Sequence, residues 1–298
     1  MPRRARLDAE LVRRGLARSR DHASELVAAG RVTVRGAVAT KPATAVTADA
    51  PLVVSEAADD PGWASRGAHK LLGALEAFEG GGLAVAGRRC LDAGASTGGF
   101  TDVLLRAGAG EVVAVDVGYG QLAWRLRTDE RVTVLDRTNV RGIDAETIGG
   151  PVGLVVADLS FISLRLVLPA LAACAAPGAD LVPMVKPQFE VGRERLGSGG
   201  VVRDPELRAE AVRSVIDAAR PLGLRARAVT ASPLPGPSGN VEYFVWFTAS
   251  PTGEGAASPG GDVPESGGGA GRAGVRDDRE EADRVRELVW DAVRSGPA

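Results

Sequence analysis

The stretch Leu91-Asp92-Ala93-Gly94-Ala95-Ser96-Thr97-Gly98-Gly99-Phe100 decides the fold of this chain. Its apolar start predicts a buried strand. Its glycines predict a turn into a helix, because a residue without Cβ lets a ligand approach the backbone closely. The spacing Gly94-x-x-x-Gly98-Gly99 differs from the GxGxxG of dinucleotide-binding proteins. The preceding Asp92 would repel a pyrophosphate but can pair with a cationic amino group. The stretch therefore favours S-adenosylmethionine over NAD, and its predicted cofactor-binding residues are Asp92, Gly94, Ser96, Thr97, Gly98, Gly99 and Phe100.

From residue 88 onward, apolar runs alternate with helical segments, a pattern typical of a doubly wound parallel sheet. We predict seven strands, at Arg89–Ala93, Glu111–Asp116, Arg131–Leu135, Gly153–Ala157, Asp180–Met184, Arg225–Thr230 and Glu242–Phe247. A segment rich in turn residues separates the last two, which we expect to pair antiparallel. The predicted fold class is therefore α/β, with the seven-stranded Rossmann-like sheet of S-adenosylmethionine-dependent methyltransferases.

Two further acids follow predicted strands. Asp116 comes twenty-two residues after Gly94, where an acid can accept hydrogen bonds from ribose hydroxyls. Asp136 follows the third strand and could reach the adenine amino group. Each acid could instead be a helix cap or a loop carboxylate. Taken together with the glycine loop, the two acids are better interpreted as cofactor-binding residues.

Lysine is rare in this chain, because only three of its 36 basic residues are lysines: Lys41, Lys70 and Lys186. Arginine stays charged at any accessible pH, whereas lysine can take up or release a proton. Lys186 follows the fifth predicted strand and Asp158 the fourth, and Glu242 begins the seventh. We expect these three side chains at the edge of the sheet where the cofactor binds, with Lys70 preceding the sheet.

The order Lys-Asp-Lys-Glu resembles the tetrad of the FtsJ/RrmJ-like ribose 2'-O-methyltransferases. That resemblance implies that Lys186 orients and deprotonates a 2'-hydroxyl. Asp158 and Glu242 would hold Lys186, and Lys70 would add positive field. Asp158 is also expected to contact the cofactor. The alternative is that Glu242 is only an acid at the start of a strand and Asp158 only a turn former.

The first fifty residues are basic. They hold ten Arg and Lys against five acids, a charge of +5, whereas residues 251–298 carry −4. Helical spacing predicts short helices over Asp8–Leu16 and Arg20–Ala29. Alternation predicts a hairpin over Arg31–Val38 that turns at Arg35-Gly36, and Leu52–Val54 forms a further strand.

This unit, RLDAELVRRGLARSRDHASELVAAGRVTVRGAVATKP, resembles the small α+β RNA-binding module named after ribosomal protein S4. Guanidinium groups bind phosphates bidentately without recognising bases, so the resemblance implies affinity for RNA more than sequence choice. A solvated basic face is the alternative. Lys41 is either structural or a phosphate contact. The predicted RNA-binding residues are Arg4, Arg6, Arg18, Arg20, Arg31 and Lys41.

The composition predicts five segments. These are an S4-like domain at 1–58, a linker at 59–66, a methyltransferase domain at 67–249, a low-complexity insertion at 250–275 and a terminal helix at 276–298. That helix should pack on the methyltransferase domain through the stripe Ala282, Val285, Leu288, Val289 and Ala292. Trp63, next to the linker, is expected to pack one domain on the next.

Composition also excludes several classes of protein. Cys90 and Cys174 have no CxxC or histidine companion, so we expect neither a disulfide nor a bound metal. No apolar leader follows Met1, and no uncharged apolar run of 18 residues occurs. We expect a cytoplasmic, monomeric protein that does not bind membranes.

Six stretches together resemble one family: ASRGAHKL, CLDAGASTGGFTDVLL, VDVGYGQLAW, VVADLSFISL, VKPQFEVG and SPLPGPSGNVEYFVW. They are similar to the TlyA family, two-domain rRNA 2'-O-methyltransferases once described as haemolysins. The resemblance covers residues 3–250. It implies S-adenosylmethionine as cofactor, ribosomal subunits as partners, and cytidine 2'-hydroxyls of 16S and 23S rRNA as substrates.

One departure and two alternatives accompany this resemblance. Members of the family carry an Arg-x-Trp-Val linker that couples the domains, whereas this chain has Pro61-Gly62-Trp63-Ala64, which puts that coupling in doubt. A membrane-active haemolysin would need an amphipathic or spanning segment that the sequence does not offer. An RNA-binding ribosome-assembly factor without chemistry is the second alternative, and the intact Lys70, Asp158, Lys186 and Glu242 argue against it.

Overall fold

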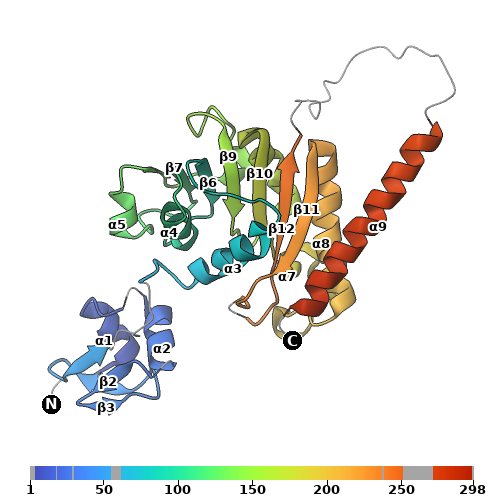
Figure 1. Ribbon diagram of the computed structural model, residues 1–298. Helices are drawn as coiled ribbons and strands as arrows, with labels where there is room; N and C mark the ends of the chain where they lie inside the picture. Colours follow the sequence, from blue (N-terminus) through green and yellow to red (C-terminus); the bar gives the residue numbers. More distant parts are fainter. Residues whose placement is uncertain are drawn as a thin grey trace. The chain divides into compact units, whose positions relative to one another are not determined.

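The chain forms two compact units, Met1–Gly62 and Trp63–Ala298, and each is described by itself (Figure 1). This computed structural model describes residues 4–17, 19–28, 30–54, 62–236, 238–250 and 271–296. The predicted RNA contact Arg18, residues 59–61 of the predicted linker and most of the predicted insertion lie outside the described residues. The boundaries proposed for the five segments stay predictions.

The N-terminal unit packs two short helices against small antiparallel sheets of order β3-β2-β5 and β1-β4. Leu7, Leu11 and Val32 are fully buried in its core. The hairpin turns at Arg35 and Gly36, whose φ angles of 53° and 82° suit the tight turn predicted there. The elements are β1 (Arg4–Arg6), α1 (Leu7–Arg13), α2 (Arg20–Ala28), β2 (Val32–Val34), β3 (Ala37–Val38), β4 (Ala45–Thr47) and β5 (Leu52–Val54).

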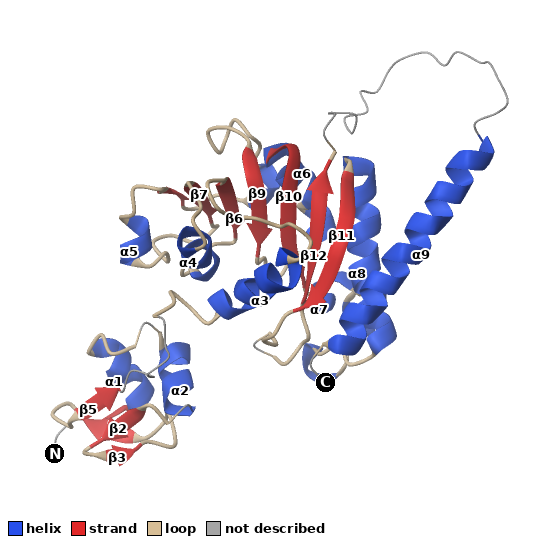
Figure 2. Cartoon of the chain, viewed as in Figure 1, coloured by secondary structure: helices blue, strands red, loops and turns tan. Residues whose placement is uncertain are grey.

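The second unit is built on a seven-stranded sheet of order β11-β12-β10-β9-β6-β7-β8 (Figure 2). Strands β10, β9, β6, β7 and β8 run parallel. β12 pairs antiparallel with β11, as predicted, and also with β10. The strands are β6 (Arg89–Ala93), β7 (Glu111–Val115), β8 (Val132–Leu135), β9 (Val152–Ala157), β10 (Ala175–Val185), β11 (Leu224–Ala231) and β12 (Tyr243–Ala249).

Helices cover both faces of this sheet. α6, α8 and α9 share one apolar core with it, and α3, α4 and α5 share the other. The main helices are α3 (Gly67–Glu79), α4 (Gly99–Arg106), α5 (Trp124–Arg127), α6 (Leu168–Cys174), α7 (Pro187–Glu190), α8 (Pro205–Ala219) and α9 (Gly271–Ser295). Single 3-10 turns are η1 (Val140–Gly142), η2 (Leu164–Leu166), η3 (Arg193–Arg195), η4 (Ser198–Gly200) and η5 (Arg220–Leu222). No helix among these described elements is long and apolar enough to cross a bilayer.

Two expectations need correction. β10 begins at Ala175, five residues earlier than predicted. Its register against β9 shifts between Ala175 and Asp180. α9 packs against β11 and α8, and its buried stripe is Val285, Val289, Ala292 and Val293. Of the predicted stripe, Ala282 is exposed and Leu288 is half-buried, whereas Val285, Val289 and Ala292 are buried.

A buried carboxylate ties several strands together. Asp180 is 6% exposed and accepts hydrogen bonds from the indole of Trp246 (2.7 Å), the hydroxyl of Thr248 (3.2 Å) and the guanidinium of Arg88 (2.6 Å). These donors lie on β12 and just before β6. Asp180 therefore links the antiparallel end of the sheet to its parallel centre.

We predict that Asp180→Ala lowers the free energy of unfolding by about 2–3 kcal/mol, because it leaves a buried indole N–H and a guanidinium without their acceptor. Denaturant unfolding followed by circular dichroism measures this. Asp217→Ala removes an exposed partner of Arg220 and is the control, with an expected change within about 0.5 kcal/mol. Equal stability of the two variants would contradict the assignment.

Candidate active site

The predicted site residues meet where β6, β9 and β10 end. Parallel pairing sets Ala93 opposite Ala157, and Ala157 opposite Pro183. The carboxyl ends of the three strands are therefore nearly aligned, and Gly94, Asp158 and Lys186 lie on one edge of the sheet. Ligands of open α/β sheets bind at this edge.

The turn after β6 can be made only by glycine at two positions. Gly94 has φ +87°, and a Cβ there would lie 2.5 Å from the carbonyl oxygen of Asp158. Gly98 has φ +96°, and a Cβ there would overlap Leu126. Both glycines are thus required by conformation and by space, and α4 starts directly after the second.

Two cavities border this turn. The smaller, about 110 Å³, is lined by the predicted residues Gly94, Ser96, Thr97, Gly99, Phe100 and Asp158, together with Ser65. The larger, about 410 Å³, includes Gly94, Ser96, Asp116, Val117, Asn139, Asp158 and the segment 159–162. The larger volume is within the range of small-molecule sites. We call the two together the donor cavity.

Three carboxylates lie at or near the donor cavity: Asp158 and Asp116 line it, whereas Asp92 is not among its described lining residues. Asp92 is fully buried, and Thr101 donates a hydrogen bond of 2.7 Å to its Oδ2, while Oδ1 has no hydrogen-bond partner among the described residues. Burial raises the pKa of Asp92 to about 7, and the charges of Asp158 and Asp116 add to this. Asp116 accepts the backbone N–H groups of Ser96 (2.8 Å) and Gly118 (2.7 Å).

Asp136 behaves differently from its predicted role. It is not among the described residues that line the donor cavity, where Asn139 lies instead. Its carboxylate accepts a hydrogen bond of 2.8 Å from Arg127, and this guanidinium lowers the pKa of Asp136. The backbone N–H of Gly120 in the β7–α5 loop donates to the same carboxylate at 3.3 Å, so Asp136 ties this loop and α5 to the end of β8, and contact with adenine stays a prediction.

The four residues of the predicted tetrad form two ion pairs. Lys186 Nζ lies 2.6 Å from Asp158 Oδ1 and donates to Ser160 Oγ at 2.9 Å. Lys70 Nζ lies 2.5 Å from Glu242 Oε2. Lys70, Lys186 and Glu242 are buried. We expected both carboxylates to hold Lys186, but Glu242 pairs with Lys70, because α3 brings Lys70 to the chain segment before β12.

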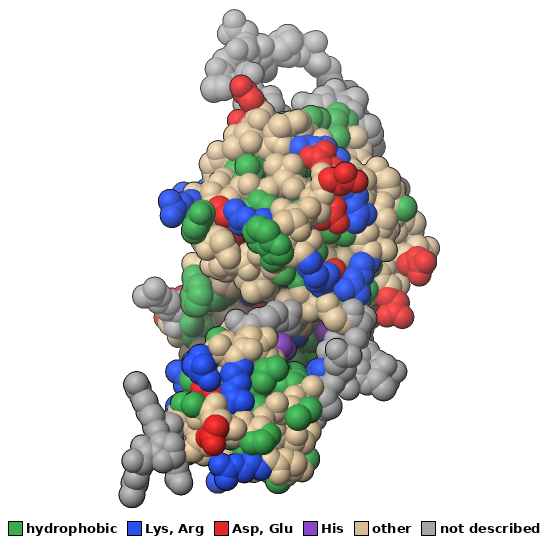
Figure 3. Space-filling model, turned by 90° about the vertical axis from the view of Figure 1, so that its left-hand side faces the viewer, with side chains coloured by type: hydrophobic (Ala, Val, Ile, Leu, Met, Phe, Trp, Pro, Cys, Tyr) green, Lys and Arg blue, Asp and Glu red, His purple; other side chains and the backbone are tan. Residues whose placement is uncertain are grey.

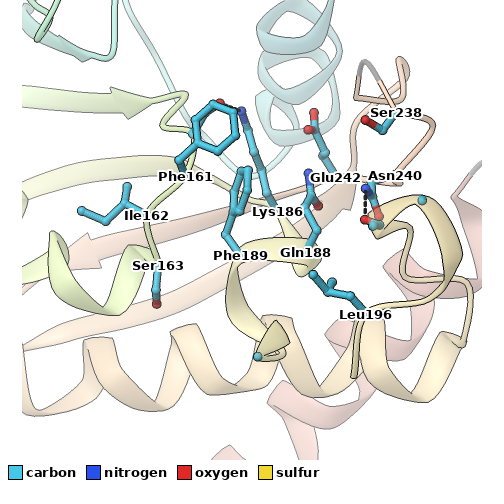
Figure 4. A pocket seen from close by; sticks show the side chains of 14 residues that line it. Phe161, Ile162, Ser163, Lys186, Gln188, Phe189, Leu196, Ser238, Asn240 and Glu242 are labelled. Atoms are coloured by element: carbon cyan, nitrogen blue, oxygen red, sulfur yellow. Dashed lines mark hydrogen bonds between the residues drawn. The ribbon is translucent and has the colours of Figure 1, made fainter. Parts of the chain in front are cut away.

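A separate cavity of about 530 Å³ is lined by Lys186, and we call it the acceptor cavity (Figure 4). Lys186, Gln188, Asn240 and Glu242 contribute polar groups, and the rings of Phe161 and Phe189 lie together at one side, with centroids 5.4 Å apart. Phe161 is 92% exposed. The segment 160–162 lines both cavities and forms the wall between them.

Sequence reasoning missed Ser65, Ser160, Phe161, Gln188 and Phe189 as site residues. Each lies within a stretch already recognised, two to five positions from a predicted residue. The signal was therefore present in ASRGAHKL, ADLSF and VKPQF. Their side-chain positions depend on how loops from different strands face one another, which local pattern does not specify.

In the N-terminal unit, Lys and Arg side chains gather on the face shown in Figure 3. Arg6 and Arg20 both pair with the buried Asp8, at 2.8 and 3.0 Å, while their own side chains are more than half exposed. The two guanidiniums, Arg6 first, lower the pKa of Asp8. Lys41 is exposed and Arg31 partly buried, and Arg4 lies in β1. Asp8 thus holds Arg6 and Arg20 next to each other, and the exposed part of each guanidinium side chain could bind an anion.

The start of the second unit is tied to α4. Arg106 lies 4.1 Å from the ring centroid of Trp63, and the backbone N–H of Ala64 donates to Asp102 at 2.8 Å. Asp102 also pairs with Arg106 and Arg125. Trp63 therefore packs on its own unit, and packing of one domain on the next stays a prediction.

Two protein-family models match the two units of the chain. The FtsJ-like methyltransferase family model matches residues 63–249, and the S4 domain model matches residues 5–51. The fold and the site thus define an FtsJ-like methyltransferase preceded by an S4 domain. The chain is 65% identical over 247 residues to the 16S/23S rRNA (cytidine-2'-O)-methyltransferase TlyA of Mycobacterium tuberculosis, covering 83% of this chain and 91% of that relative. The chain belongs to the TlyA family.

The name hemolysin occurs among similar proteins too. Hemolysin A of Brachyspira hyodysenteriae is 35% identical over 243 residues, which cover 81% of this chain and 99% of that protein. A solved structure from Streptococcus thermophilus that carries a hemolysin name superposes with a TM-score of 0.69 at 34% identity, covering 99% of this chain and 97% of the other. Both names are therefore found for proteins similar to this one.

Asp92 gives a prediction about pH. Its pKa is raised from 3.8 to about 7 on folding, so the folded chain binds one more proton than the unfolded chain between these values. Stability contributed by Asp92 is therefore complete below about pH 4 and is lost as pH rises toward 7, by at most about 1.4 kcal/mol per pH unit.

Asp92→Asn should remove this component, so that the parent loses stability relative to the variant between pH 5 and pH 7. Denaturant unfolding of both proteins without cofactor at several pH values measures it. Parallel stability profiles would contradict the assignment to Asp92.

Proposed function

We propose that this chain transfers a methyl group from S-adenosylmethionine to the 2'-hydroxyl of a cytidine in ribosomal RNA. The observation that carries the proposal is the Lys186–Asp158 ion pair, 2.6 Å long, which joins the donor cavity to the acceptor cavity. The M. tuberculosis relative, named for this reaction on 16S and 23S rRNA, supports the choice of nucleotide and substrate.

The donor cavity suits S-adenosylmethionine, which supplies an electrophilic methyl group on a positively charged sulfur. Asp92 does not line the cavity, but it lies two residues before Gly94 with an Oδ1 that has no hydrogen-bond partner among the described residues, and its charge would favour the ammonium of the amino-acid part. Asp116 keeps lone pairs for ribose hydroxyls beside the two backbone N–H groups that it already binds. Three nearby carboxylates favour a cationic ligand and disfavour a pyrophosphate.

Lys186 is the proposed catalytic residue. Its amine lies in the acceptor cavity, where it can bind the 2'-oxygen and stabilise the negative charge that develops there as the proton leaves. In its neutral form the amine takes that proton, which a guanidinium cannot do. Asp158 and Ser160 hold the amine in place. The Lys70–Glu242 pair supplies a second fixed charge pair at the same edge.

The acceptor cavity is large enough for one unstacked nucleotide. Phe161 and Phe189 offer aromatic faces for the base, and Gln188 offers both a donor and an acceptor for its polar edge. The Oε1 atom of Gln188 is buried without a hydrogen-bond partner among the described residues. These features support RNA as the substrate, because its bases are recognised mainly when they are unstacked.

The N-terminal unit is proposed to bind phosphates of the same RNA through Arg6, Arg20 and their neighbours. The exposed pair held by Asp8 supports this role. Ribosomal RNA as substrate would make ribosomal subunits the partners and the cytoplasm the site of action. A ribosome-assembly factor without chemistry would bind the same subunits but would consume no cofactor.

We predict that Lys186→Arg lowers kcat about a hundredfold or more on ribosomal subunits, because arginine keeps the charge but cannot accept a proton. Its Kd for S-adenosylmethionine should stay within about threefold of the parent, since Lys186 lines the acceptor cavity. Single-turnover methyl transfer and calorimetry measure the two quantities.

Arg220→Lys makes the reverse exchange at an exposed arginine of the second unit and is the matched control, with near-parent turnover expected. Near-parent turnover by Lys186→Arg would contradict its catalytic role. No turnover by the parent on either subunit would instead favour the assembly factor.

We further predict that Arg6→Ala and Arg20→Ala each weaken binding to ribosomal subunits and flatten the plot of log affinity against log salt by roughly 0.7 to 0.9. Each variant removes one phosphate contact, so the loss should be similar for different RNA sequences. Arg220→Ala, which removes an exposed arginine of the second unit, is the control. An unchanged salt slope would show that these arginines do not contact phosphates.

A further inference from the structure

A buried carboxylate outside the proposed tetrad joins the two loops that line the acceptor cavity. Glu190 is the last residue of α7, four positions after Lys186, and it is 6% exposed. Its Oε2 accepts a hydrogen bond of 2.5 Å from Ser163 Oγ, and its Oε1 accepts one of 2.7 Å from the backbone N–H of Leu164. One side chain thus links α7 to the segment that follows Asp158.

That segment contains the wall between the cavities, residues 160–162, and it is held in an unusual conformation. Phe161 has φ +63° although it is not a glycine. The left-handed region is unfavourable for a bulky side chain, so it persists only where neighbouring contacts fix the backbone. The two bonds to Glu190 come two and three residues after Phe161 and supply such contacts.

The position of this wall determines both sides of the proposed reaction. Ser160 accepts the hydrogen bond of Lys186, and Phe161 faces Phe189, which directly precedes Glu190 (Figure 4). If the wall moved, the amine, the aromatic pair and the border of the donor cavity would move together. A displacement of about 1 Å can cost on the order of a hundredfold in rate.

We propose that Glu190 is a positioning residue that holds the wall 160–162 in register with Lys186, an inference that rests on the proposed methyl transfer. It acts through Ser163 and Leu164 and does not touch the reacting atoms. Arg165 completes the arrangement, because its guanidinium donates to Glu190 Oε2 and to the Glu190 carbonyl oxygen, both at 3.3 Å. A carboxylate suits the task, since its two oxygens accept two donors at a fixed spacing.

Hydrogen exchange tests the physical part of the proposal without any activity. In Glu190→Ala, the amides of residues 160–166 should exchange about tenfold faster or more, while the other segments of the second unit keep parent rates. Glu190→Gln should stay close to the parent. Its amide oxygen can accept from Leu164 N–H, and its NH₂ group can donate to Ser163 Oγ, so it loses only the long bond of 3.3 Å from Arg165 Nε.

Methyl transfer to ribosomal subunits tests the functional part. Glu190→Ala should lower kcat about 10- to 100-fold and change KM for the subunit less than about threefold, because most RNA affinity comes from phosphate contacts elsewhere. Glu190→Gln should retain kcat within about threefold. Asp217→Ala, an exposed carboxylate of α8, is the control for loss of a negative charge and should match the parent.

Two results would overturn the proposal. One is parent-like kcat in Glu190→Ala. The other is exchange that rises throughout the second unit, because Glu190 would then support the fold in general. If the parent itself transfers no methyl group, the proposed function fails, and the exchange arm still decides whether Glu190 holds the wall.

Discussion

The parallel pairing of β6, β9 and β10 is the constraint on which the site depends. Their central residues, such as Leu91 and Val155, are fully buried, so the apolar core fixes which face of each strand turns inward. A slip of one residue would turn every side chain to the other face of the sheet. The register of the three strands is therefore enough to place Gly94, Asp158 and Lys186 at one edge of the sheet.

Several charged groups at this edge are buried, and burial affects them in two ways. Lys70 and Lys186 each have a carboxylate partner, because an isolated buried ammonium would be strongly unfavourable. Such pairs add little net stability, since desolvation offsets their attraction. They do provide charges that are already oriented when a reaction begins. Asp92 has no cationic partner in the described part of the chain, and burial raises its pKa to about 7.

Local chemistry made much of this predictable. The glycine loop and the Arg35-Gly36 turn follow from backbone sterics, and the strands follow from apolar runs, so sequence alone gave the sheet and the edge at which the site lies. What failed depends on contacts between distant segments. Glu242 pairs with Lys70, not with Lys186, because α3 brings Lys70 to the chain segment before β12. The start of β10 was not predicted because Pro177 and Gly178 are residues typical of turns. β1 and β4, with three residues each, are too short to show an alternation of apolar and polar residues.

In the proposed reaction, the Lys186–Asp158 pair would let one short contact serve both the methyl donor and the methyl acceptor. Asp158 lines the donor cavity, and Lys186 lines the acceptor cavity, so the ion pair crosses the boundary between them. Ser160, which accepts from the same amine, belongs to the wall that both cavities share. In the proposed reaction, a long planar guanidinium would fill the space of the acceptor oxygen, whereas an ammonium presents a compact donor. Lysine at position 186, in a chain that uses arginine almost everywhere else, would then be favoured by geometry as well as by proton chemistry.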